Sequence, residues 1–176
     1  MEVIGIVAIS LDGFITQGNK PGSAFTSAAD KVWFSQILET FSAHLMGSVT
    51  FEAEREPITR AARNTSSKLR LVFTRSPRKY HSLAKPGRLE FTDEHPAAVL
   101  RRIRDQGHER VALLGGGQIY GLFLRENLLD ELWVTLEARV FGTGTPVFAG
   151  EHRKNLNLIE VANLDPNTLL LKYKPE

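Results

Sequence analysis

The sequence predicts an α/β fold, with helices on both faces of a sheet that is parallel in its middle and mixed at its edge. Short apolar runs rich in β-branched residues alternate with segments whose apolar residues recur at helical spacing. The last two apolar runs, Leu156–Val161 and Thr168–Tyr173, have no helix between them and predict a closing antiparallel hairpin. With 176 residues, 42% hydrophobic and 24% charged, the chain is predicted to form one domain over residues 1–176.

The first part of the chain predicts two strands and two helices. Val3–Ser10 is a buried strand that ends in a turn at Leu-Asp-Gly, and Thr16–Phe25 is a polar loop. A helix opens at Ser27, whose hydroxyl can cap it, and its apolar residues are Val32, Trp33, Ile37, Leu38 and Phe41. A strand at Ala43–Gly47 and a short helix at Thr50–Arg55 follow.

The second part continues the alternation up to the closing hairpin. Its predicted strands are Leu69–Thr74, Leu89–Phe91, Val111–Leu114 and Glu131–Val140, and its predicted helices are Pro96–Gln106 and Gln118–Asn127. Phe141–Pro146 is a turn rich in Gly, Thr and Pro.

Three glycines stand between the strand Val111–Leu114 and the helix that begins near Gln118. Glycine lets the backbone approach a ligand, and a helix N-terminus presents free N–H groups to an anion, so this pattern is typical of a phosphate cradle. The motif is neither a GxGxxG fingerprint nor a P-loop. A tight strand-to-helix turn is the other interpretation.

Ligands of α/β sheets bind beyond the carboxyl ends of the strands. That rule predicts a common rim for four segments that are far apart in the sequence, namely Ser10–Gly13, Gly47–Thr50, Thr74–Ser76 and Gly115–Gln118.

Four motifs along the chain resemble the dihydrofolate-reductase-like superfamily, and within it the reductase domain of riboflavin biosynthesis. They are Ala8–Gly13 (Ala-Ile-Ser-Leu-Asp-Gly), Ala29–Phe34 (Ala-Asp-Lys-Val-Trp-Phe), Leu45–Glu52 (Leu-Met-Gly-Ser-Val-Thr-Phe-Glu), and Leu114–Tyr120 with Leu132–Thr135. The Ser-Leu-Asp-Gly opening is similar to the riboflavin reductases rather than to true dihydrofolate reductases. The resemblance implies a three-layer α/β/α dihydrofolate-reductase-like fold.

The resemblance further implies an NADPH-dependent reductase of a pyrimidine substrate. NADPH is expected to contact Gly47, Ser48, Thr50, Thr74, Arg75, Ser76, Gly115, Gly116, Gly117, Gln118 and Ile119. A cis peptide between Gly115 and Gly116 and a homodimer are implied as well. An uncovered edge near Leu169–Leu171 in the closing hairpin is the physical motive for the dimer.

Four residues are candidates for catalysis through the same resemblance. Asp30 lies under the substrate ring, where an acid in an apolar wall can hold a proton, and Thr135 is its expected hydroxyl partner. Asp12 and Glu54 are further carboxylates of the same neighbourhood. Without the resemblance, Asp30 reads as a first-turn helix charge, and Trp33 and Phe34 read as core residues.

Two positions depart from the dihydrofolate reductases. Ser48 stands where many of them carry an Arg that pairs with the adenosine phosphate, so Arg75 is the candidate phosphate partner, with a solvated turn charge as the alternative. Lys68 falls near the arginine that holds the folate tail and lacks its forked donors, which argues against folate as the substrate.

Composition excludes several other classes. With no cysteine the chain has no disulfide or thiolate zinc site, and its five histidines show no ligand spacing, so no metal is expected. A net charge of +2 gives no reason to expect nucleic acid, and without a signal peptide or membrane span the expected location is the cytoplasm. Dihydrofolate reductase and a nucleotide-binding module without turnover remain the alternatives to the pyrimidine reductase.

Overall fold

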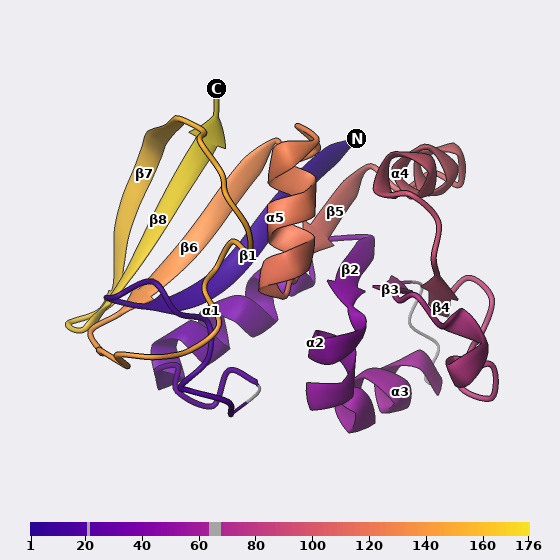
Figure 1. Ribbon diagram of the computed structural model, residues 1–176, viewed down its shortest axis with the longest axis horizontal. Coiled ribbons are helices and arrows are strands. Elements are labelled where there is room, and N and C mark those ends of the chain that lie inside the picture. Colours follow the sequence, from indigo (N-terminus) through magenta and orange to yellow (C-terminus); the bar gives the residue numbers. More distant parts are fainter. Residues whose placement is uncertain (21, 64–67) are drawn as a thin grey trace.

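The computed structural model describes residues 1–20, 22–63 and 68–176, and these form one mixed sheet with helices on both faces (Figure 1). The strand order within this part is β4-β3-β2-β5-β1-β6-β8-β7. The strands are β1 (Glu2–Ser10), β2 (Ala43–Gly47), β3 (Leu69–Phe73), β4 (Leu89–Thr92), β5 (Arg110–Leu113), β6 (Glu131–Glu137), β7 (Leu156–Asp165) and β8 (Thr168–Pro175). All pairings from β4 to β6 are parallel, and β8 is antiparallel to β6 and β7, as predicted.

The helices make the outer layers. They are α1 (Ala28–Leu38), α2 (Ser48–Ala53), α3 (Arg55–Arg63), the 3-10 helix Pro77–Tyr80, α4 (Pro96–Asp105) and α5 (Gly117–Arg125). Side chains of α4 and α5, such as Val99 and Phe123, pack in a core on one face of the sheet. Trp33 of α1 and Phe51 of α2 belong to two smaller cores, which hold the other strand side chains. The three-layer arrangement is therefore confirmed.

Some boundaries differ from the predictions because contacts distant in sequence decide them. The helix α3 was not predicted: its apolar residues are few, although they recur at helical spacing, and only Ala62 is fully buried. The short helix before it begins at Ser48 rather than Thr50. The strand β6 ends at Glu137, and the predicted continuation to Val140 is wrong. There Ala138 donates to Asn167 in the β7–β8 turn, and Val140 is exposed.

The C-terminal hairpin does not leave the predicted edge uncovered. Strand β8 lies between β6 and β7, and Leu170 is buried, so the expectation of an exposed edge at Leu169–Leu171 is wrong. The free edge belongs to β7, whose Leu158 and Val161 are more than half exposed. Apolar side chains on an edge strand favour pairing with another chain. Homodimerisation stays a prediction, and β7 is the strand that it concerns.

Candidate active site

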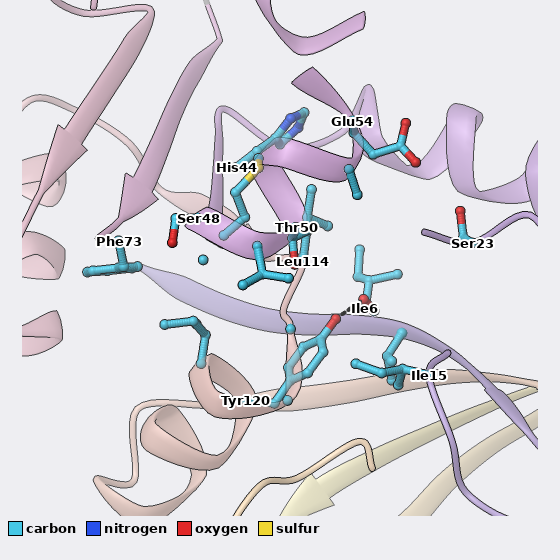
Figure 2. Close-up of a pocket in the computed structure, with 18 of the residues that line it drawn as sticks. Ile6, Ile15, Ser23, His44, Ser48, Thr50, Glu54, Phe73, Leu114 and Tyr120 are labelled. Atoms are coloured by element: carbon cyan, nitrogen blue, oxygen red, sulfur yellow. Dashed lines mark hydrogen bonds between the residues drawn. The ribbon is translucent and has the colours of Figure 1, made fainter. Parts of the chain in front are cut away.

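An open cleft of about 1610 Å³ lies at the carboxyl ends of the parallel strands (Figure 2). Residues from β1, α1, β2, α2, β3, α5 and β6 line it, so segments far apart in the sequence meet there. Three of the four predicted rim segments contribute to the lining, through Gly47–Thr50, through Thr74 with Arg75, and through Gly116–Ile119. The fourth, Ser10–Gly13, does not line the cleft.

One wall of the cleft is lined by Gly47, Gly116 and Gly117, which with Gly115 form a glycine cradle; Gly115, although predicted to contact the cofactor, does not itself line the cleft. The Gly47 N–H donates to the Gly115 carbonyl at 2.7 Å, which ties the β2–α2 turn to the β5–α5 turn. The peptide between Gly115 and Gly116 is cis, as the resemblance implied. Helix α5 has Gly116 as its N-cap and no side-chain cap. Its first N–H groups therefore lack intrahelical acceptors and are available to a ligand.

Packing requires glycine at two of these positions. Gly115 has φ +88°, and a Cβ there would lie 2.4 Å from the Tyr120 ring, whose hydroxyl donates to the carbonyl of Ile6. A Cβ on Gly117 would lie 2.5 Å from the Pro146 carbonyl oxygen. A Cβ on Gly116 would instead meet its nearest atom, Thr50 Oγ1, at 3.4 Å, close to ordinary contact. The triplet is thus both a tight turn and part of the cleft wall, so the two interpretations are compatible.

The predicted cofactor residues are divided by the structure. Ser48 and Thr50, at the start of α2, line the cleft and are labelled in Figure 2. Thr74 and Arg75, which follow β3, line it as well. Ser76 does not line it, and its backbone N–H donates to Thr74 Oγ1 at 3.2 Å. The cleft therefore offers Arg75 and hydroxyls to a phosphate, but not the Ser76 side chain.

A second wall is polar and is built from Asp30, Thr135, His44 and Arg70. Asp30 on α1 is only 5% exposed, and no donor within the described residues bonds to its carboxylate. Thr135 on β6 is 1% exposed, and its hydroxyl has no partner in the same part of the chain. The expected hydrogen bond between the two side chains is absent. A buried polar group without a partner is costly, so the Thr135 hydroxyl is suited to bonding a ligand, and the Asp30 carboxylate lines the same cleft with its acceptors unused.

The two other candidate acids have different fates. Asp12 does not line the cleft: its carboxylate accepts from Ser10 Oγ at 2.6 Å and from the Gly142 N–H at 2.7 Å. These hydrogen bonds, the one from Ser10 first, lower the pKa of Asp12. The geometry gives Asp12 a role in fastening a loop, which corrects its assignment as a catalytic group. Glu54 does line the cleft and lies on the same side of it as Ser23 in Figure 2.

Sequence reasoning missed the far end of the polar wall. His44 and Arg70 are register partners on β2 and β3, and Arg70 is 9% exposed. Their side chains lie on the sheet face opposite Ala43, Leu45 and Leu69, which belong to the core under α4 and α5. Two polar residues on one face of otherwise apolar adjacent strands were the available signal.

Hydrogen bonds at this end join the strands to the end of α1. The Leu38 carbonyl lies 3.2 Å from His44 Nε2 and accepts from Lys68 Nζ at 3.0 Å. Lys68 also pairs with Glu39 at 2.7 Å, and Arg70 Nη1 donates to the Lys68 carbonyl at 3.2 Å. Burial lowers the pKa of His44 to about 4, so its imidazole is neutral at pH 7. The counter-ion of Lys68 at this end of the wall is Glu39.

Two other features are absent from the described residues. No group of three or more His, Asp or Glu side chains is placed there to hold a metal ion. None of the helices in the described part of the chain is both long and apolar enough to cross a membrane.

The sheet topology, the glycine cradle and the acid on the first helix define a dihydrofolate-reductase-like α/β domain. The family model described as the RibD C-terminal domain matches residues 2–170, and the chain belongs to this family. A sequence relative is the uncharacterized protein YwjB of Bacillus subtilis (strain 168), 26% identical over 147 residues, which covers 81% of this chain and 79% of the relative.

Solved structures share the fold at low identity. A pyrimidine reductase-like protein of Corynebacterium diphtheriae is similar with a TM-score of 0.79 at 14% identity, covering 99% of this chain and 92% of that one. The deaminase/5-amino-6-(5-phosphoribosylamino)uracil reductase of Thermotoga maritima is similar with a TM-score of 0.78 at 17% identity. The match covers 99% of this chain but 56% of the Thermotoga chain. These likenesses confirm the fold class.

Proposed function

We propose that this protein is an NADPH-dependent reductase of a pyrimidine ring, similar to 5-amino-6-(5-phosphoribosylamino)uracil reductase. The observation that carries the proposal is a pair of side chains on the polar wall without a hydrogen-bond donor or acceptor within the described residues, the carboxylate of Asp30, which is 5% exposed, and the buried hydroxyl of Thr135. A pyrimidine offers ring N–H groups and carbonyl oxygens that would satisfy both. Membership of the RibD C-terminal domain family supports the same reaction class.

The glycine cradle fits a dinucleotide diphosphate. Gly116 and Gly117 bring the uncapped start of α5 to the cleft, and the Ser48 and Thr50 hydroxyls lie on the same wall. Arg75 is the cation that would bond the additional phosphate of NADPH. When bound there, the nicotinamide supplies the hydride.

Asp30 and Thr135 act on the substrate ring. The carboxylate accepts from a ring N–H and holds the ring in one orientation, while the Thr135 hydroxyl bonds a neighbouring acceptor. Because Asp30 is buried on α1, water has little access to it. In this proposal the carboxyl group acts as the general acid–base group that passes a proton to the reduced atom.

Arg70 is suited to the phosphate of a ribosylamino substituent. One of its nitrogens donates to the Lys68 carbonyl, and the guanidinium has five N–H donors in total, so donors remain for an anion in the cleft. A forked guanidinium binds phosphate through two oxygens at once. The substrate proposed here therefore extends from Asp30 to Arg70.

Dihydrofolate reductase is the second candidate, favoured by Asp30 and the cradle. The cation near the folate-tail position, Lys68, is already paired with Glu39 and with the end of α1, so it is a poor receptor for a glutamate carboxylate. A nucleotide-binding module without turnover is the third candidate.

Cofactor oxidation separates these candidates. The purified protein is mixed with NADPH and either the ribosylamino-pyrimidine phosphate or dihydrofolate, and the loss of NADPH absorbance is followed. We expect turnover with the pyrimidine phosphate only. Turnover with dihydrofolate alone would establish the second candidate. Saturable NADPH binding without consumption, with either substrate, would establish a binding module and refute the proposal.

A further inference from the structure

Glu137 is a buried acid just outside the candidate active site. It is the last residue of β6 and is 3% exposed, yet it does not line the cleft. Within the described residues, its carboxylate bonds to no cation. Oε1 accepts from the Ser27 backbone N–H at 2.8 Å, and Oε2 accepts from Thr168 Oγ1 at 3.2 Å. Burying a carboxylate is costly, which suggests that Glu137 has a role beyond packing.

The hydrogen bonds of Glu137 lead directly to Asp30. Ser27 is the N-cap of α1, and its hydroxyl accepts from the Asp30 backbone N–H at 3.0 Å. The hydroxyls of Ser27 and Thr168 are 3.0 Å apart. A threonine hydroxyl has one hydrogen, so when Thr168 donates to Glu137, the Ser27 hydroxyl is free to donate to Thr168. Glu137 is therefore linked to Ser27 twice, directly at the backbone N–H and through Thr168 at the hydroxyl.

The same strand face supplies a row of contacts to α1. Trp133, Thr135 and Glu137 alternate along β6 and so point to one face of the sheet. Trp133 packs on Trp33 of α1, with ring centroids 6.4 Å apart. Thr135 lines the cleft, and Glu137 holds the start of the helix. One strand therefore sets both the Thr135 hydroxyl and the helix that carries Asp30.

The backbone of Glu137 is itself firmly placed. It pairs with Ser10 of β1 on one side and with Thr168 of β8 on the other. Its carboxylate is therefore a fixed point at the carboxyl edge of the sheet. Ser27, by contrast, follows a long loop and has no ladder of its own to fix its position.

We propose that Glu137 is a positioning residue: through Ser27 and Thr168 it fixes the first turn of α1 and thereby the place of Asp30 in the cleft. The catalytic part of this inference rests on the proposed function. Without the anchor, α1 would still pack through Trp33, but its first turn would move relative to the substrate ring. Misplacing a reacting group by about 1 Å costs up to about 100-fold in rate.

Four variants test the anchor. Glu137→Ala removes it, while Glu137→Gln keeps an acceptor for the Ser27 N–H and an amide that can donate to Thr168. Thr168→Val removes one of the two links and serves if Glu137→Ala does not fold. Asp130→Ala is the matched control, because its carboxylate also accepts a distant backbone N–H, that of Val3 at 2.7 Å, and it does not line the cleft.

The first readout is hydrogen exchange of the Asp30 amide in the full-length protein, which requires no catalysis. Relative to amides of the central strands, we expect exchange to be about five to ten times faster in Glu137→Ala, as for the loss of a helix cap. We expect no change relative to the central strands in Asp130→Ala, and near wild-type exchange in Glu137→Gln. Equal effects in Glu137→Ala and Asp130→Ala would overturn the proposal.

The second readout is the division of the effect between turnover and cofactor binding. We expect kcat to fall about tenfold or more in Glu137→Ala with the Kd for NADPH unchanged, and to recover in Glu137→Gln. Faster exchange with unchanged kcat would overturn the positioning role. If the wild-type protein has no turnover, the proposed function fails, and the exchange at Asp30 alone decides whether the anchor exists.

Discussion

The two walls of the cleft are built in different ways. The glycine cradle offers backbone N–H groups, and two of its glycines, Gly115 and Gly117, are required by ring or backbone atoms 2.4–2.5 Å from where a Cβ would stand. The polar wall offers side chains from α1, β2, β3 and β6, held on regular elements. The cradle can therefore keep one ligand while other residues change, whereas a single substitution on the polar wall changes the chemistry. Under the proposed function, this difference would let the fold keep its cofactor while its substrate changes.

Asp30→Asn should distinguish the roles of the two walls most clearly. An amide keeps the shape but cannot carry the charge or hold the proton, so we expect turnover to fall about 10²–10⁴-fold. NADPH affinity should stay unchanged, because the cradle is untouched. Thr135→Val should give a smaller loss in the same direction. Steady-state kinetics and NADPH titration check this. A changed melting temperature with unchanged turnover would identify Asp30 as a helix-start charge.

His44 allows a test of the far end of the polar wall by pH. Burial lowers its pKa in the folded protein to about 4, below the 6.5 of the unfolded chain, so between these values the unfolded state binds more protons. The free energy of unfolding should therefore decrease as pH falls through this window, by about 3 kcal/mol in all. Lys68 and Arg70 act in the same direction as burial, and Glu39 opposes them.

Denaturant unfolding at pH 7 and pH 4 measures that decrease. In His44→Gln the amide can still donate to the Leu38 carbonyl but does not titrate in this range. In His44→Gln, the decrease in the free energy of unfolding between pH 7 and pH 4 should therefore be smaller than in the wild type by most of the about 3 kcal/mol attributed to His44. An identical pH dependence in both proteins would show that His44 is not held neutral.

Gly117→Ala tests the glycine cradle, where we expect NADPH affinity to fall, in contrast to Asp30→Asn. A Cβ would press on the Pro146 carbonyl at 2.5 Å and displace the start of α5, so we expect the Kd for NADPH to rise about 10–100-fold, as for the loss of one hydrogen bond to a charged group. Gly121→Ala is the control, because its Cβ would press on the Ala149 carbonyl at 2.6 Å but Gly121 does not line the cleft. Both should lose stability. Equal NADPH affinity in the two variants would contradict the cradle.

The smallest expected effect concerns Arg75, the cation proposed to bond the additional phosphate of NADPH. NADPH should bind more tightly than NADH, and Arg75→Ala should narrow that difference by about tenfold, the loss of one charge-assisted hydrogen bond. Arg78→Ala removes a nearby cation that does not line the cleft and should leave the ratio unchanged. Calorimetric titration with both cofactors measures the ratio. Equal dissociation constants in the wild type would refute this assignment.

Local patterns in the sequence determined most elements of the fold and part of the site. The capping hydroxyl of Ser27 and the glycine triplet at the end of β5 act through their immediate neighbours in the chain, so they could be read directly. The parallel middle of the sheet followed from the alternation of strands and helices, and its mixed edge followed from the closing hairpin. What lies within one or two turns of a residue was predictable.

Tertiary structure alone decided which polar residues face the cleft. Asp12 and Asp30 both lie in motifs that carry the family resemblance. Loop N–H groups of Phe141 and Gly142 donate to the Asp12 carboxylate, whereas the Asp30 carboxylate has no donor within the described residues. His44, Arg70 and Glu137 lie in strands, and segments distant in sequence set their surroundings. His44 is the register partner of Arg70 and contacts the end of α1, and Glu137 is the register partner of Thr168 on β8. The physical reason is that burial and hydrogen-bond partners of a side chain depend on segments distant in sequence, which no local pattern contains.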